Sequence, residues 1–357
     1  MIAILKREIR NYLKRPLFWI GVLIVIVGVY QNLDPYLKIH YVESEEELQS
    51  LTENYPETVP DADISDGYVP AKEADRRQSW EKTIRETLIA EFDMTEADAR
   101  AVVDGMREME IREACAYLEQ EYHYFGAIYT WEDTAYHKGT REEVNSYIKS
   151  KLEKKSFSWY FSRKFADFAG LFMGFFASVM LAVLFWQDTR KSTYELLHTK
   201  PVGAGRYVLG KAAGGFAVCL LVLLILNLVF WAACLISVKS SGFAVRLTDF
   251  LAATVLYILP NMMMIVCVYG LISLLFQNPL PAVPLLILYI VYSNMGSRNA
   301  DGVFGYYGRP LAIMVRFPGS FFETAAPPMA LWNQSFLIAA SAGILLVCVQ
   351  LWKRRRI

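Results

Sequence analysis

Long apolar runs alternate with polar stretches along this chain, at lengths typical of membrane-spanning helices. A helix needs about 20 apolar residues to cross a bilayer, and six runs reach or approach that length. They cover residues 16–33, 165–186, 212–236, 251–276, 280–295 and 335–352. The pattern predicts an all-α polytopic membrane protein with six transmembrane helices. A mostly helical extracytoplasmic domain, residues 34–160, is expected between helices one and two, and residues 161–357 are expected to hold helices two to six.

Basic residues predict which side of the membrane each segment faces. Five Lys or Arg lie in residues 1–15, five in the link 187–211 and four near the end of the chain, against two in 237–249 and three in 296–334. Short cytoplasmic segments are richer in Lys and Arg than external ones, whereas a segment as long as 34–160 crosses regardless of its charge. We therefore expect a multi-pass protein of the plasma membrane with both termini cytoplasmic.

Residues 1–15 predict an amphipathic helix. Apolar side chains recur at helical spacing between five basic ones: Ile2, Leu5, Ile9 and Leu13. This pattern suits a helix that lies on the anionic cytoplasmic leaflet. The next run, 16–33, ends without the small residues of a signal-peptide cleavage site, so we expect it to remain as transmembrane helix 1.

The extracytoplasmic domain is acidic. Between Asp34 and Lys155 there are 29 acidic and 15 basic residues, although the whole chain has 36 of each. A cationic peptide is therefore one candidate cargo, because such a charge raises the local concentration of cations. Ordinary solvated domains are often acidic as well, so a simple water-facing surface is the other interpretation.

Helix signals recur within this domain. Trp80, Ile84 and Leu88 lie on one stripe of a predicted helix at 79–92. Thr95 followed by Asp98 predicts a helix start, and Thr140 with Glu143 has the spacing of a capping box. The part before residue 72 is expected to be irregular, the helix that follows Thr95 to continue as far as Leu118, and residues 122–131 to form a strand or an extended segment.

The second apolar run carries a stripe of small residues at four-residue spacing: Ala166, Gly170, Gly174, Ser178 and Ala182. Small side chains let helix backbones approach closely in a membrane, where lipid gives helices no hydrophobic reason to associate. We expect this stripe to pack against another span of the chain or against a second permease.

The link 187–211 contains a short helix by the same rules. Ser192 and Glu195 have the spacing of a capping box, and Pro201 disfavours helical dihedrals at Lys200. A helix is therefore expected at about 192–200, across the cytoplasmic ends of spans two and three. A plain loop closure between two helices has the same features.

The sequence ELLHTKPVGAGRYVLGK, residues 195–211, resembles the link between spans two and three of type-2 ATP-binding cassette (ABC) exporter permeases. In that family the link is a coupling helix that docks on a separate ATPase subunit. The resemblance implies docking through the following residues: Tyr194, Glu195, Leu196, Leu197 and His198. Arg206 and Lys211 are expected to anchor the following span at the inner interface. The segment at about 296–334 resembles the family's outer re-entrant helices between spans five and six.

No catalytic motif is present in the sequence. It contains no phosphate-binding GxxxxGK[ST], no HExxH, no GxSxG and no CxxC pair. We therefore expect a chain that is not an enzyme, whose ATP and Mg are bound by a partner ATPase. The four histidines, His40, His123, His137 and His198, are scattered, so no metal site is expected. The five cysteines are expected to be buried apolar residues rather than disulfides.

These features favour the membrane-spanning permease subunit of an ABC exporter, with a peptide or an amphipathic compound as cargo. The expected partners are ABC ATPase subunits, a second permease copy or a related permease, and the lipid bilayer, but no nucleic acid. Asn227 and Asn261 lie within apolar runs, where interhelical hydrogen bonding or cargo contact would occupy them. A sensor or assembly protein of the cell envelope that moves no cargo is the main alternative, and a polytopic membrane enzyme is the third.

Overall fold

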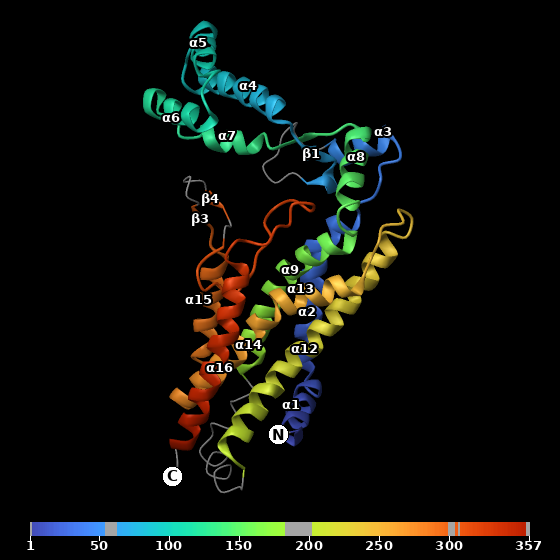
Figure 1. Cartoon of the computed structure of the whole chain (residues 1–357), viewed down its shortest axis with the longest axis vertical. Helices are drawn as coiled ribbons and strands as arrows, with labels where there is room; N and C mark the ends of the chain where they lie inside the picture. The colour runs from blue at the N-terminus through green and yellow to red at the C-terminus, as the bar shows by residue number, and fades with distance from the viewer. Residues whose placement is uncertain (1, 54–62, 183–201, 299–303, 306–307, 355–357) are drawn as a thin grey trace. The chain divides into compact units, whose positions relative to one another are not determined.

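A computed structural model describes residues 2–53, 63–182, 202–298, 304–305 and 308–354. The chain divides into two compact units. Unit 1 comprises Met1–Lys38 and Lys155–Ile357, and unit 2 comprises Ile39–Lys154. Unit 1 contains all the long apolar helices, whereas unit 2 is built from shorter, more polar helices. Figure 1 shows both units with their elements labelled.

Unit 1 is a helical bundle with one small hairpin. Its helices are α1 (Ile2–Leu13), α2 (Pro16–Leu37), α9 (Phe157–Met180), α12 (Ala204–Ser237), α13 (Leu247–Tyr257), α14 (Leu259–Phe276), α15 (Ala282–Asn294) and α16 (Ala330–Arg354). The hairpin pairs β3 (Ser297–Arg298) with β4 (Phe304–Gly305) in antiparallel register. The start of α1, the start of α12 and the end of α16 lie at the same end of the bundle (Figure 1).

Local sequence explains several of the helix ends. Pro16 occupies the first turn of α2, where its missing N–H leaves no helical bond unmade. Ser156 caps α9 by accepting a hydrogen bond from the N–H of Trp159 at 3.2 Å. The fourth predicted span is broken at Ile258 into α13 and α14, because Pro260 cannot donate a backbone hydrogen bond to the preceding turn.

Within the described residues, four helical stretches are long and apolar enough to cross a bilayer: α2, α12, the combined α13 and α14 (Leu247–Phe276), and α16. The predicted fifth span corresponds to the shorter apolar helix α15. Helix α9 carries three charged residues in its first half, Arg163, Lys164 and Asp167, and is not among the four. The total of six spans therefore stays a prediction.

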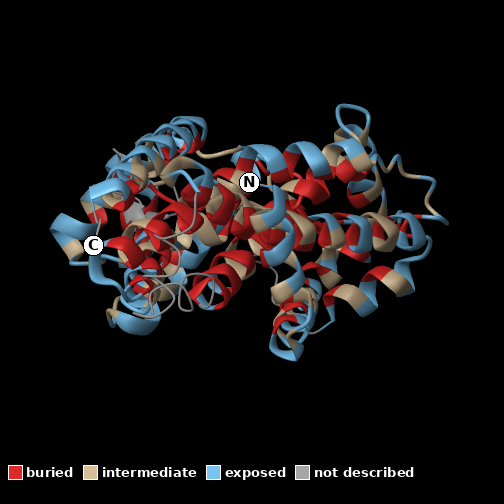
Figure 2. Cartoon of the chain, turned by 90° about the horizontal axis from the view of Figure 1, so that it is seen from below, coloured by how far each residue is buried: buried red, intermediate tan, exposed pale blue. Residues whose placement is uncertain are grey.

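Helix α12 has one buried face and one exposed face. Its buried positions recur every three or four residues from Tyr207 to Cys234, while Leu224 and Leu228 between them are exposed. Buried and exposed positions are red and pale blue in Figure 2. Positions with this spacing share one face of a helix, so α12 packs on its neighbours along one side.

Unit 2 contains seven helical segments and one two-stranded sheet among its described residues. In order these are α3 (Glu45–Thr52), the 3₁₀ turn η1 (Ile64–Asp66), β1 (Tyr68–Pro70), α4 (Glu73–Glu91), α5 (Glu96–Met106), α6 (Ile111–Tyr122), α7 (Ala127–Asp133), β2 (Tyr136–Lys138) and α8 (Arg141–Leu152). The two strands are antiparallel, with Val69 opposite His137. Trp80, Ile84 and Leu88 of α4 are fully buried against α5, α6 and α7.

The helix starts predicted at Thr95 and Thr140 are confirmed, and the helix predicted at 79–92 is found but begins earlier, at Glu73. Three other expectations are wrong. The part before residue 72 is not irregular throughout, because it holds α3, η1 and β1. The helix that begins after Thr95 ends at Met106, where the Arg77 guanidinium binds the carbonyl oxygens of Met106 and Met109 at 2.7 Å each. Half of the segment 122–131 belongs to helix α7, in which Trp131 packs edge-on against Trp80, and none of the segment is a strand.

The capping box of α8 predicts a pH-dependent contribution to stability. The Thr140 N–H donates to Glu143 Oε2 at 2.9 Å and lowers the pKa of that carboxyl. A lowered folded-state pKa stabilises the fold above the unfolded-state pKa, and the gain is lost as the pH falls through the folded-state value.

We therefore expect Glu143→Gln to weaken α8 by less than about 1 kcal/mol at pH 7, because this glutamate is half exposed, and by progressively less as the pH falls below the unfolded-state pKa. Hydrogen exchange of the α8 amides in the full chain, wild type against E143Q, measures this difference. A difference that grows towards low pH would contradict it.

Candidate functional site

The residues expected to dock an ATPase, Tyr194 to His198, lie outside the described residues. The structure describes the two helices that flank this link. Helix α9 and the turn after it are described as far as Ala182, and α12 begins at Ala204. The surroundings of the predicted docking link can therefore be described from the end of α9 and the start of α12.

Helix α1 contacts both the end of α9 and the start of α12. The Tyr12 hydroxyl donates to the backbone oxygen of Met180, at the end of α9, at 3.2 Å. Glu8 Oε1 lies 2.8 Å from Lys211 Nζ, in the second turn of α12. Glu8 and Lys211 are 6% and 5% exposed, so this ion pair is buried, and breaking such a pair by removing one partner is strongly destabilising. The two ends of the predicted docking link are thus tied to one short helix.

Two glycines allow α1 to approach α12 closely. A Cβ atom at Gly210 would lie 3.2 Å from Ile4 Cβ, and one at Gly214 would lie 2.8 Å from Glu8 Cβ. Both distances are shorter than ordinary carbon contacts, so a larger side chain would push the two helices apart. Helix α1 forms where the sequence predicts it, and its Glu8 and Tyr12 are buried in unit 1. Of the two predicted interface anchors, Arg206 is exposed and Lys211 lies inside the protein.

Gly214→Val is expected to loosen α1 from α12 at a cost of about 1–3 kcal/mol, the usual range for overpacking a close contact. The matched control is Gly205→Val, because a Cβ there has nothing within 4 Å. Hydrogen exchange of the α1 amides in the full chain should become faster in G214V and stay unchanged in G205V. Equal protection in both variants would contradict this description of the contact.

The stripe of small residues on α9 and just after its end is buried throughout: Ala166, Gly170, Gly174, Ser178 and Ala182. Four residues from other parts of unit 1 pack against this stripe. A Cβ at Gly170 would reach Ile258, and one at Gly174 would collide with Met314 and contact Ile290 of α15. The backbone oxygen of Ser178 accepts a hydrogen bond from the Tyr269 hydroxyl of α14.

At the opposite end of unit 1, a charged cluster ties α9 to the segment 308–329. Asp167 accepts a hydrogen bond from Arg316 Nε, and a second, at 3.1 Å, from the backbone N–H of Phe317. Lys164 Nζ donates to the backbone oxygen of Phe317 at 3.0 Å and to that of Gly319. Arg316 also donates to Asn294 Oδ1 at 2.7 Å. Lys164 and Asp167 are 4% and 3% exposed, so the cluster is buried.

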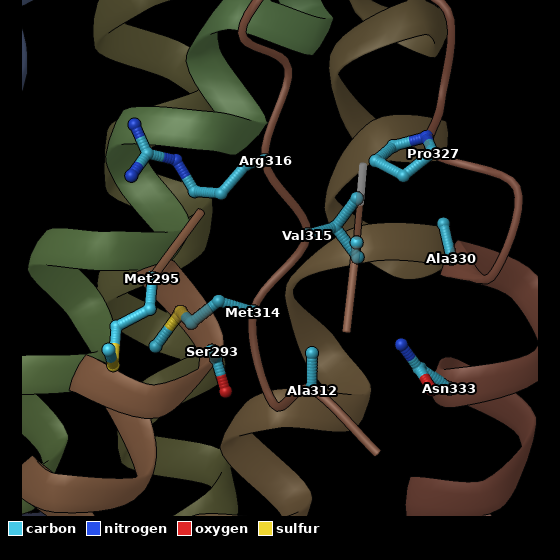
Figure 3. Close-up of a pocket in the computed structure, with 10 residues that line it drawn as sticks. Ser293, Met295, Ala312, Met314, Val315, Arg316, Pro327, Ala330 and Asn333 are labelled. Atoms are coloured by element: carbon cyan, nitrogen blue, oxygen red, sulfur yellow. The ribbon is translucent and has the colours of Figure 1, made fainter. Parts of the chain in front are cut away.

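The segment 308–329 differs from the re-entrant helices expected here. It contains no helix; it is an irregular chain whose residues Ala312 to Phe317 are mostly buried. A small pocket lies beside it, between α15 and α16 (Figure 3). Figure 3 shows Arg316 pointing from this segment towards α9.

The polar side chains that line this pocket already have partners. Ser293 Oγ accepts the Ile313 N–H at 2.9 Å. Asn333 accepts the Leu311 N–H and donates to the Arg309 oxygen, both at 2.8 Å. Their arrangement holds the segment 308–317 in place.

The two membrane asparagines form interhelical hydrogen bonds. Asn227 of α12 bonds the Thr254 hydroxyl of α13 at 2.9 Å, and Gln334 of α16 donates to Asn261 of α14 at 3.1 Å. Among the described residues, no group of three or more His, Cys, Asp or Glu side chains could hold a metal ion. His40 and His137 instead lie 2.7 Å and 3.9 Å from single glutamates. All five cysteines are free thiols, and burial raises the pKa of Cys115 in unit 2 to about 11.

A family model described as ABC-2 family transporter protein matches residues 2–305. This match covers α1, unit 2, the docking link and the helices through α15. No match to the chain is found among curated proteins or among solved structures.

Proposed function

Because the chain belongs to the ABC-2 family of transporter proteins, we propose that it is the permease subunit of an ABC exporter, driven by an ATPase that docks on residues 192–200. Members of this family are membrane subunits without ATPase activity, and this chain is a multi-pass membrane protein. Its sequence lacks a phosphate-binding loop, so ATP and Mg belong to the partner. A second permease, identical or related, completes the path.

The observation that supports this proposal best is the attachment of α1 to both sides of the docking link. A displacement of the link by the ATPase would be transmitted by α1 to α9 through the Tyr12 hydrogen bond and to α12 through the Glu8–Lys211 ion pair. It also reaches α2, because α1 runs into α2 within three residues and the Trp19 indole donates to the Leu13 oxygen at 2.9 Å. Helix α1 and its contacts thus form one rigid corner that moves α2, α9 and α12 together. A switch between inward- and outward-facing states requires such a joint movement.

The acidic charge of unit 2 favours a cationic cargo. We place that unit outside the cell, where its acidic excess raises the local concentration of cationic peptides. Export assays with pairs of peptides that differ only in the sign of their charge test this. Equal export of both members of a pair would remove cationic peptides as the preferred cargo.

Co-purification tests the permease function itself. The full chain, tagged and extracted from its own membranes in mild detergent, should bring down an ABC ATPase with measurable ATP hydrolysis. A sensor or assembly protein that moves no cargo would be recovered without one. The same preparation of an unrelated tagged membrane protein from the same cells is the control for contaminating hydrolysis.

A further inference from the structure

An apolar groove of about 300 Å³ lies on unit 1, away from the pocket and the charged cluster. Four side chains of α12, three of α14 and Leu345 of α16 line it. Its lining is almost entirely apolar, and Leu209 at its edge is 43% exposed, so the groove opens to the surroundings of the protein. All three helices belong to stretches long enough to span a bilayer, which places the groove within the lipid.

One end of the groove carries positive charge. On α12, Arg206 precedes Leu209, Ala213 and Phe216 by three, seven and ten residues, so it shares a helix face with these lining residues. At 1.5 Å per residue, Arg206 to Phe216 spans about 15 Å, which is the thickness of the hydrocarbon in one leaflet. Arg206 thus lies where a lipid headgroup would lie if its acyl chain filled the groove.

A second basic residue lies at the same end of unit 1. Tyr207 of α12 stacks on Trp352 of α16, with ring centroids 4.2 Å apart and planes inclined by 25°. This stack brings the first turn of α12 beside the last turn of α16, where Lys353 is exposed next to Trp352. Arg206 and Lys353 therefore lie at the same end of unit 1, in the part of the chain that we place at the cytoplasmic face.

We propose that this groove binds one acyl chain of an anionic phospholipid, with Arg206 binding the phosphate of its headgroup and Lys353 adding positive charge at the same membrane depth. The apolar walls exclude a polar ligand, and the two cations select against a zwitterionic headgroup. Basic residues next to a membrane each contribute attraction of about 1 kcal/mol for anionic lipid, which is about fivefold in affinity. The site lies beside the α1–α12 contact, so a bound lipid would support the corner that carries the docking link.

Native mass spectrometry of the purified full chain tests this with defined lipids. Phosphatidylglycerol and phosphatidylcholine with identical acyl chains are added to the delipidated protein. Wild type should retain phosphatidylglycerol in preference, and R206Q with K353Q should lower that preference by about fivefold for each charge removed. Lys239→Gln, at the other end of α12, should leave it unchanged.

Ala213→Phe fills the groove and should abolish retention of either lipid, whereas Ala252→Phe, at an exposed position of α13, should not. Equal retention of the two lipids by wild type would overturn the proposal, as would normal retention by A213F. The same spectra report the number of chains in each particle. If A213F separated paired chains and left lipid binding intact, the groove would be an interface between copies, which would also overturn it. If A213F does not fold, the lipid preference of R206Q with K353Q, compared with that of K239Q, tests the proposal by itself.

Discussion

Replacing Glu195, Leu196, Leu197 and His198 together by alanine is expected to remove the ABC ATPase from the purified chain. These four residues begin the segment 195–211, which resembles the coupling-helix link of ABC exporter permeases. Losing a central docking contact costs about 2 kcal/mol or more, which weakens binding about 30-fold. Co-purified ATP hydrolysis should therefore fall to a few per cent of the wild-type value, and export should stop with it.

The matched control replaces four exposed residues at the other end of α12 by alanine: Ile236, Ser237, Lys239 and Ser240. This variant should keep both the ATPase and export. Because the chain must still fold, the amount of protein recovered and its thermal unfolding are compared in both variants. Full ATPase recovery with the 195–198 variant would show that docking depends on another surface.

Asp167→Ala is expected to destabilise unit 1 by about 3–5 kcal/mol, the usual cost of breaking a buried ion pair by removing one partner. The carboxylate binds Arg316 and the Phe317 N–H, and its charge also offsets the buried Lys164 beside it. Without it, Arg316 and the Phe317 N–H lose their bonds to α9, and the segment 308–329 should detach from that helix. Thermal unfolding of the full chain measures the loss, and trypsin cleavage after Arg316 reports the detachment.

Asp34→Ala is the control for this variant. Asp34 forms a surface pair with Lys38, whose side chain is 69% exposed, so its loss should cost less than about 1 kcal/mol. The double variant D167A/R316A should lose clearly less than the sum of the two single losses, because removing both partners leaves fewer uncompensated charges. Additive losses would mean that the two residues act independently.

Local rules predicted much of the helical structure. The apolar stripe of Trp80, Ile84 and Leu88 places a helix correctly, and the side chains of Thr95 and Thr140 cap helices as their spacing predicts. Pro260 marks the break in the fourth span. The resemblance of residues 195–211 to an ABC permease link predicted the right family. The match to the ABC-2 family model confirms it.

Contacts between distant residues were beyond local rules. Arg316 lies 149 positions from Asp167, and Lys211 lies 203 positions from Glu8. Periodicity and caps carry no information about such pairs. The same holds for α7, where the long-range packing of Trp131 on Trp80 outweighs the strand preference of an aromatic run.

Two sequence signals could have indicated these contacts. Glu8 is the only acidic residue in the basic segment 1–15, and Gly210 with Gly214 provides a surface where a helix can approach. Lys164 and Asp167 stand three positions apart at the start of an apolar run, where charges are costly unless they are paired. Each signal indicates that a partner exists, and only the fold identifies it.

Photocrosslinking from within the docking link tests the central claim most directly. A photoreactive amino acid replaces Leu196 in the full chain in living cells, and the same replacement at the exposed Ile236, at the other end of α12, is the control. We predict that illumination joins position 196 to a nucleotide-binding protein and that position 236 gives no such product. Labelling of position 196 by a membrane-impermeant reagent from outside the cell, with no ATPase adduct, would contradict the claim.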